Sequence, residues 1–151
     1  MPNLNQAAPP FKLKSNKDKE FALSDYLGQK HVVLVFYPLD FSPVCSNQLP
    51  EYSSREEDIE AAGAVILGIN RDSVYTHKAW AQAFGITIPL LADLNGAVAK
   101  SYEVYLDHLG MSTRAVFIID KEGMLRFKHV EATPGQFTLS AADLLSELQK
   151  L

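Results

Sequence analysis

The chain has 151 residues, 47% hydrophobic and 21% charged, which suits one domain, residues 1–151, with a sizeable core. Its formal charge of -4 gives no general attraction for nucleic acid or an anionic membrane, and no apolar run approaches the length of a membrane span. We therefore expect no nucleic acid and no membrane among its partners. Because the first ten residues have neither the basic nor the apolar segment of a signal peptide, we expect a cytoplasmic protein.

The first part of the chain predicts a hairpin and then a buried strand. Residues 11–13 and 20–23 flank a polar turn, a pattern typical of a small hairpin at the edge of a fold. Residues 31–37 are apolar at nearly every position, which favours a central strand buried on both faces. This strand leads the chain toward Cys45.

Two helices and a second strand are expected next. The sequence predicts a helix over 43–62, kinked near its second turn by Pro50, because proline removes one backbone hydrogen bond. Residues 64–70 indicate a second buried strand. A further helix begins with a cap at residue 72 or 73 and ends at Gly85.

The second half of the chain predicts shorter elements and a hairpin. A strand over 88–91 and a helix over 97–102 precede a hairpin formed by 113–120 and 124–131. The last helix, from 140 to about 150, begins with a capping-box spacing. Parallel crossovers followed by a hairpin indicate an α/β fold with a mixed central sheet and helices on both faces.

Cys45 is the only cysteine, so no disulfide can form within the chain. A lone cysteine is most often a buried, inert filler. Here, however, Ser42 and Pro43 are typical of a helix cap and a first helical residue, which places Cys45 at the third helical position. The unpaired N-H groups and the positive dipole of a helix start favour thiolate over thiol.

The residues around Cys45 also show a family resemblance. Pro38, Ser42 four positions later and Cys45 three further, after an apolar strand, resemble the active-site signature of the peroxiredoxins. The resemblance extends over essentially the whole chain, through the segments 8–13, 64–72 and 113–120. It implies a thioredoxin-like three-layer fold with an N-terminal β-hairpin.

The resemblance implies a role for four residues. Cys45 is the nucleophile that attacks peroxide and becomes a sulfenic acid, and Pro38 shapes the pocket and shields the thiolate. Ser42 supplies a hydroxyl where threonine is commoner in the family. Arg114 stabilises the thiolate and donates to the peroxide. Without the motif, Pro38 simply ends a strand and Arg114 is equally well an exposed residue at a strand end.

Gln48, Trp80 and the four histidines also bear on the candidate site. Gln48 stands where many family members have a carboxylate that orients the arginine, so whether it supports Arg114 is left open. Trp80, with Phe84 four residues on, favours core packing. The histidines have no metal-ligand spacing, so we expect neither a metal nor another cofactor; they are His31, His77, His108 and His129.

Two hypotheses for the function remain at this stage. The first is a thiol-dependent peroxidase that reduces hydrogen peroxide or organic hydroperoxides and is regenerated by an external thiol or redoxin, because the chain has no second cysteine. The alternative is a non-catalytic thioredoxin-like binding or redox-sensing module. A C-x-x-C oxidoreductase would need a second cysteine at Ser42 or Gln48, and nothing in the sequence places a histidine near Cys45, as a Cys-His hydrolase requires. The chain ends directly after its last helix, so we expect no long C-terminal arm and, by resemblance, a possible homodimer.

Overall fold

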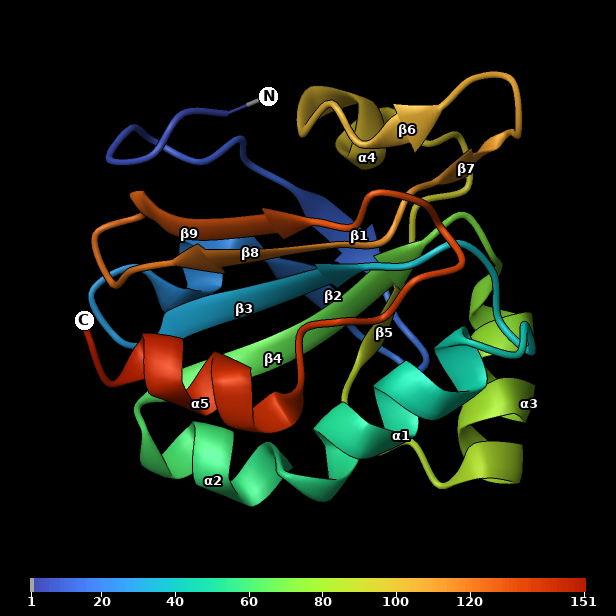
Figure 1. The fold of residues 1–151 in the computed structure, drawn as a ribbon, viewed down its shortest axis with the longest axis horizontal. Helices are drawn as coiled ribbons and strands as arrows, with labels where there is room; N and C mark the ends of the chain where they lie inside the picture. The colour runs from blue at the N-terminus through green and yellow to red at the C-terminus, as the bar shows by residue number, and fades with distance from the viewer. Residues whose placement is uncertain (1) are drawn as a thin grey trace.

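The computed structural model describes residues 2–151 and is built on one five-stranded sheet (Figure 1). The strands, in spatial order, are β5 (Leu90–Ala92), β4 (Ala64–Asn70), β3 (His31–Phe36), β8 (Ala115–Ile119) and β9 (Leu125–Val130). β3, β4 and β5 are parallel, whereas β8 runs antiparallel to β3 and β9 antiparallel to β8. The predicted mixed sheet is confirmed.

Two small hairpins lie outside this sheet. β1 (Lys12–Lys14) pairs with β2 (Glu20–Ala22), which confirms the predicted N-terminal hairpin, and the short 3-10 helix η1 (Leu23–Tyr26) follows it. The second hairpin, β6 (Tyr105–Leu106) with β7 (Met111–Ser112), was not predicted, because two-residue strands are too short to show alternation.

Helices cover both faces of the sheet, as expected. They are α1 (Cys45–Ser54), α2 (Glu56–Ala61), α3 (Val74–Phe84), α4 (Ala97–Ser101) and α5 (Ala141–Leu148). In Figure 1, α1, α2 and α5 lie together below the sheet, and α4 lies above it. α3 packs on the same side as α1, and the N-terminal hairpin packs on the side of α4.

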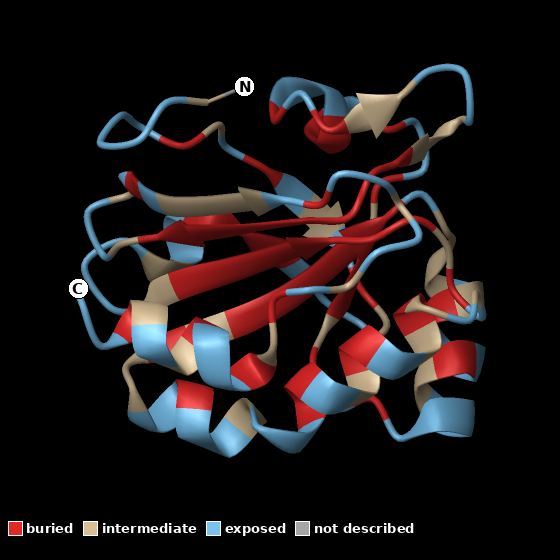
Figure 2. Cartoon of the chain, in the orientation of Figure 1, coloured by how far each residue is buried: buried red, intermediate tan, exposed pale blue. Residues whose placement is uncertain are grey.

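The core has two halves because successive side chains of a strand point to opposite faces. Val33 and Val35 of β3 belong to the cluster that packs against α1, α2, α3 and α5. Val32 and Leu34 belong to the cluster that packs against α4 and the N-terminal hairpin. Figure 2 shows the central strands almost entirely in the colour of buried residues. β3 is therefore buried on both faces, as its unbroken apolar sequence predicts.

The predicted helix over 43–62, kinked near Pro50, is in the structure two helices, α1 and α2, and it begins at Cys45. Pro50 lies inside α1, which continues to Ser54, and the helix is interrupted at Arg55, with φ -113° and ψ 15°. The Arg55 N-H donates to Tyr52 O at 3.1 Å, a bond of the tighter 3-10 type, so the last turn of α1 narrows before α2 begins. The break between α1 and α2 thus falls at Arg55, and not at Pro50, where the kink was predicted.

The predicted caps of two other helices are confirmed. Ser73 caps α3 by accepting from the Thr76 N-H, and Gly85 ends it in the left-handed region at φ 67°. α5 begins with a capping box in which Ser140 and Asp143 each accept from the other's backbone N-H. These short-range signals depend only on residues within one turn, so sequence suffices to find them.

Candidate active site

Three chain segments converge at one end of the sheet. Phe36, the last residue of β3, pairs with Ala115, the first residue of β8, so Arg114 lies beside the chain that leaves β3. The Glu131 N-H, just after β9, donates to Arg114 O at 3.0 Å. The antiparallel register therefore brings Arg114 beside the loop that leads from β3 into α1.

Cys45 is the first residue of α1 and is fully buried. The first turn begins as expected, since the Ser46 N-H donates to Ser42 O at 2.9 Å. The predicted cap is wrong: Val44 occupies the N-cap position, and no side chain caps the helix. The Ser42 hydroxyl instead donates to Leu39 O at 2.9 Å, which closes the turn before the helix.

Arg114 contacts the cysteine directly. Its side chain is buried, with only 2% of the residue exposed, so it is not a surface arginine at a strand end. Nη2 donates to Cys45 Sγ at 3.2 Å, and Nη1 donates to Gln48 Oε1 at 2.5 Å. Pro134 O accepts from both Nε, at 3.2 Å, and Nη2, at 3.0 Å. The guanidinium is therefore oriented by three acceptors, Cys45 Sγ, Gln48 Oε1 and Pro134 O.

The charge of Arg114 has no carboxylate partner. Within residues 2–151, no carboxylate oxygen lies within 4.0 Å of its guanidinium nitrogens. A buried cation is costly unless an anion offsets it. The group that this geometry places against the cation, besides the Gln48 amide and the Pro134 carbonyl, is the sulfur of Cys45.

The amide of Gln48 links the arginine to the core. Oε1 accepts from Arg114, while Nε2 donates to Tyr52 Oη at 3.3 Å. Tyr52 in turn donates to Leu139 O at 2.6 Å, and burial raises the pKa of Tyr52, so its hydroxyl keeps that proton. The contact between Gln48 and Arg114, left open by the sequence, is present. An amide suits this place because it accepts at one end and donates at the other.

A second polar network, which sequence reasoning missed, fixes the loop between β3 and α1. Asp40 Oδ1 accepts from Tyr37 Oη at 2.8 Å and from Asn70 Nδ2 at 3.1 Å. Asp40 Oδ2 lies 2.6 Å from His77 Nδ1, and His77 Nε2 donates to Leu91 O at 3.0 Å. Burial is the main cause that raises the pKa of Tyr37, and the charge of Asp40 raises it further, so this hydroxyl remains a donor. The buried network ties the loop to β4, α3 and β5.

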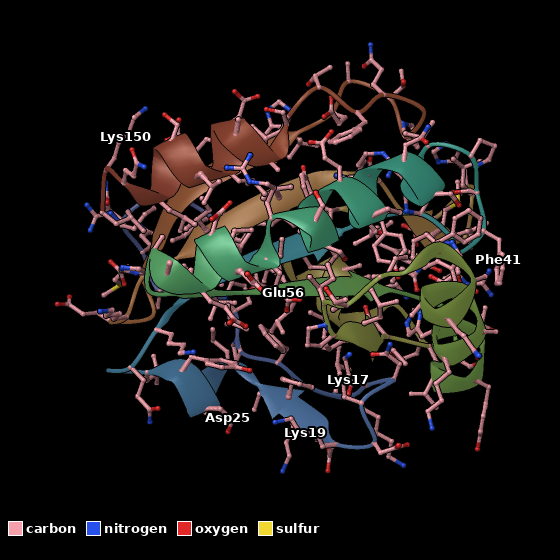
Figure 3. The ribbon with its side chains drawn as sticks, turned by 90° about the horizontal axis from the view of Figure 1, so that it is seen from below. Lys17, Lys19, Asp25, Phe41, Glu56 and Lys150 are labelled. Atoms are coloured by element: carbon pink, nitrogen blue, oxygen red, sulfur yellow. The ribbon has the colours of Figure 1, made fainter. Side chains whose placement is uncertain are left out.

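An aromatic cluster supports the same loop from outside. Trp80 is buried, as predicted, and stacks on Tyr37 with ring centroids 5.4 Å apart; its Nε1 donates to Ser46 Oγ at 3.2 Å. Phe41, at φ 67° and 51% exposed, packs against Trp80 and Phe84. Figure 3 shows Phe41 beside α3. A bulky residue is strained at positive φ, so the surrounding contacts must hold it there.

Comparison with known proteins identifies the family of this chain. A model of the AhpC/TSA family matches residues 4–128. The chain belongs to the AhpC/TSA family. The chloroplastic 2-Cys peroxiredoxin BAS1 of Hordeum vulgare is 38% identical over 136 residues, which cover 83% of this chain and 65% of that protein. Alkyl hydroperoxide reductase E of Mycobacterium tuberculosis is 34% identical over 138 residues, which cover 90% of each.

A solved structure supports the same family assignment. The crystal structure of Enterococcus faecalis AhpC matches 99% of this chain and 92% of its own, with a TM-score of 0.91 and 30% sequence identity. The resemblance to peroxiredoxins and the thioredoxin-like fold are thereby confirmed. The chain spans 65% of the length of the H. vulgare relative and 51% of that of the Spinacia oleracea BAS1 protein.

The four candidate residues of this AhpC/TSA domain lie at different depths in the site. Cys45 and Arg114 are in direct contact. Pro38 is buried directly after Tyr37, where it starts the loop, and Ser42 lies in the same loop with its hydroxyl turned toward Leu39 O.

Across residues 2–151, no group of three or more His, Cys, Asp or Glu side chains is arranged to hold a metal ion. No helix in this described part of the chain is both long and apolar enough to cross a membrane.

Proposed function

We propose that this protein is a thiol-dependent peroxidase that reduces hydrogen peroxide or organic hydroperoxides through Cys45. One observation supports this proposal above the others: a buried guanidinium, with no carboxylate partner among residues 2–151, donates to the sulfur of a buried cysteine at a helix start. A structural filler cysteine has no need of such a cation. The family of the chain agrees with this chemistry.

The proposed first step is attack of the Cys45 thiolate on one peroxide oxygen. A sulfur-oxygen bond forms, the O-O bond breaks, and the leaving oxygen takes a proton to become water or an alcohol. The sulfur is oxidised to a sulfenic acid. Arg114 stabilises the thiolate before attack and the negative charge on the departing oxygen during it, while Pro38 and Ser42 shape the approach to the sulfur.

The second step needs a thiol from outside the chain, because Cys45 is its only cysteine. An external thiol condenses with the sulfenic acid, releasing water and forming a mixed disulfide at Cys45. A second thiol then attacks the outer sulfur and releases Cys45 as a thiol, with the two reductant sulfurs joined. A small-molecule thiol or a redoxin meets this requirement. Several relatives are named 2-Cys peroxiredoxins, whereas this sequence has one cysteine, and for this reason the proposed route of regeneration uses an external thiol.

Two further expectations complete the proposal. By resemblance we propose a homodimer, which a monomeric mass in sedimentation would contradict. A cytoplasmic location remains the prediction made from the sequence.

The proposal is tested by mixing the reduced protein with one equivalent of hydrogen peroxide or cumene hydroperoxide and following the loss of free thiol. We expect rapid loss of the thiol and trapping of a sulfenic acid by dimedone at Cys45. The Cys45→Ser variant is the control and should consume no peroxide. A thiol that survives the peroxide unchanged would favour the alternative, a non-catalytic binding module.

A further inference from the structure

The orientation of Arg114 depends on a carbonyl group in a loop. Two of the bonds from its guanidinium, those of Nε and Nη2, end at Pro134 O. Pro134 lies in the segment between β9 and α5, which has no helix or strand and is coloured orange-red in Figure 1. We call residues 132–137 the strap. A turn within the strap, in which the Gln136 N-H donates to Thr133 O at 3.1 Å, encloses Pro134, and the bonds at the two ends of the strap fix this turn relative to the sheet.

Glu131 fixes the base of the strap. Its backbone N-H donates to Arg114 O at 3.0 Å, so it lies directly across from the arginine. Its carboxylate reaches over the strap to Thr138, accepting from the Thr138 N-H at 2.8 Å and from the Thr138 hydroxyl at 2.8 Å. The two residues that flank the strap are therefore bonded to each other, and Pro134 is held between them.

The carboxylate of Glu131 is buried and ionised. Only 4% of its side chain is exposed, and His129 Nε2 lies 3.1 Å from Oε2. Burial by itself raises the pKa of Glu131, but the hydrogen bonds from the Thr138 N-H, the Thr138 hydroxyl and His129 outweigh it and lower the pKa. An ionised carboxylate accepts from all these donors at once, which a neutral acid does not.

The far end of the strap is attached to the same site. Phe137 packs edge-on against Tyr52, with ring centroids 5.6 Å apart, and Leu139 O accepts from Tyr52 Oη. Tyr52 in turn accepts from Gln48, the other partner of Arg114. Both acceptors that orient the guanidinium are thus connected to this one segment.

We propose that Glu131 is a positioning residue for the Cys45 site, because its bonds to Thr138 hold the strap so that Pro134 O directs Arg114 onto the sulfur. Glu131 acts through the strap and has no contact of its own with Cys45 or with the guanidinium. Its effect on peroxide reduction rests on the proposed function. Its effect on the ionisation state of Cys45 follows from the geometry alone.

The test compares Glu131→Ala, Glu131→Gln and Thr138→Val with the wild type. Two quantities are measured in the folded proteins: the thiolate content of Cys45 at neutral pH, from the ultraviolet absorbance relative to Cys45→Ser, and the rate of reaction with hydrogen peroxide. Glu131→Ala should lower the thiolate content and slow the reaction about tenfold, since small misplacements of catalytic groups are costly. Glu131→Gln, which still accepts from the Thr138 N-H, should recover part of both.

Glu51→Ala is the matched control. Its carboxylate also accepts from a backbone N-H, that of Ala141 at 2.8 Å, but beyond the far end of the strap. This variant should lose some thermal stability and keep the thiolate content and the rate. A purely structural role for Glu131 would give Glu131→Ala that same pattern.

Unchanged thiolate content and peroxide rate in folded Glu131→Ala would overturn the inference, as would equal losses in Glu51→Ala. If Glu131→Ala does not fold, Thr138→Val takes its place, because it removes only one hydroxyl donor at an exposed position. An unchanged thiolate content and peroxide rate in Thr138→Val would then overturn the inference. If the wild type consumes no peroxide, the proposed function fails. The thiolate comparison between wild type and Glu131→Ala still decides the positioning role in that case.

Discussion

The guanidinium of Arg114 donates to the sulfur of Cys45 at 3.2 Å, across 69 positions of sequence and with both side chains buried. This contact joins the start of α1 to the start of β8. It is produced by the pairing of Phe36 with Ala115 in the sheet. The two candidate residues are thus brought together by the pairing of two central strands of the sheet.

The first prediction concerns the shape of this cation. Arg114→Lys should slow the reaction with peroxide about 100-fold, the usual cost of losing one oriented donor. A single ammonium group cannot reach Cys45 Sγ, Gln48 Oε1 and Pro134 O together, as the planar guanidinium does. Stopped-flow kinetics of the reduced variant measure the rate.

Arg126→Lys is the matched control, because Arg126 pairs at 3.2 Å with Asp120, away from Cys45, and is 44% exposed. It should react at the wild-type rate. Wild-type kinetics in a folded Arg114→Lys would show that the planar shape of the guanidinium has no part in the reaction.

The second prediction concerns the amide bridge. Gln48→Leu removes the acceptor for Arg114 Nη1 and the donor to Tyr52. A buried donor left without a partner costs about 1–3 kcal/mol, so the free energy of unfolding should fall by roughly that amount. The peroxide rate should fall about tenfold, as the guanidinium loses one of its supports. Denaturant unfolding and stopped-flow kinetics give the two values.

Asn47→Leu provides the comparison, since it replaces a neighbouring, exposed amide in the same helix. We expect little change in either quantity. Similar results for Asn47→Leu and Gln48→Leu would mean that the bridge does not support the arginine.

Short-range features of this molecule could be predicted from sequence, and the candidate residues Cys45 and Arg114, which the structure brings into contact, were also named from it. The caps at Ser73 and Ser140 depend on residues within one turn, and the spacing of Pro38, Ser42 and Cys45 is a local pattern. Arg114 was found only because a family resemblance gave it a role. Its position before an apolar strand was otherwise equally consistent with a surface residue.

The remaining features depend on contacts between distant segments. Pro134 acts through its backbone carbonyl, which every residue has, so its side chain gives no signal. Asp40 and His77 meet because α3 packs beside the loop, and no periodicity links positions 37 apart. The Ser42 hydroxyl, predicted to cap the helix, instead donates to Leu39 O, because the chain turns between these two residues.

The third prediction concerns alkaline pH. Burial raises the pKa of Tyr37, Tyr52 and Tyr102, and burial followed by the charge of Asp25 raises that of Tyr26 to about 12. In the unfolded chain these phenols ionise near pH 10. The unfolded state therefore releases protons first, so the contribution of these tyrosines to the free energy of unfolding should be constant below about pH 10 and fall as the pH rises above it.

Denaturant unfolding between pH 8 and pH 11 checks this, together with phenolate absorbance in the native protein. We expect these four tyrosines to ionise only as the protein unfolds. Complete ionisation of all six tyrosines near pH 10, with an intact circular dichroism spectrum, would contradict the prediction.

The last prediction follows from the single, buried cysteine. Without a reductant, the sulfenic acid at Cys45 finds no second thiol in its own chain. A disulfide between two copies requires two sulfurs, each buried at the start of a helix, to meet at bonding distance, whereas an external thiol has to reach only one. Excess peroxide should therefore oxidise the sulfenic acid further, to sulfinic and sulfonic acid, and inactivate the protein. Intact mass spectrometry after graded peroxide should show about two or three added oxygens on the monomer, located at Cys45. Cys45→Ser, treated in parallel, corrects for oxidation of methionine. If a covalent dimer is the main product, or if a saturating external thiol fails to protect Cys45, regeneration by an external thiol is the wrong account.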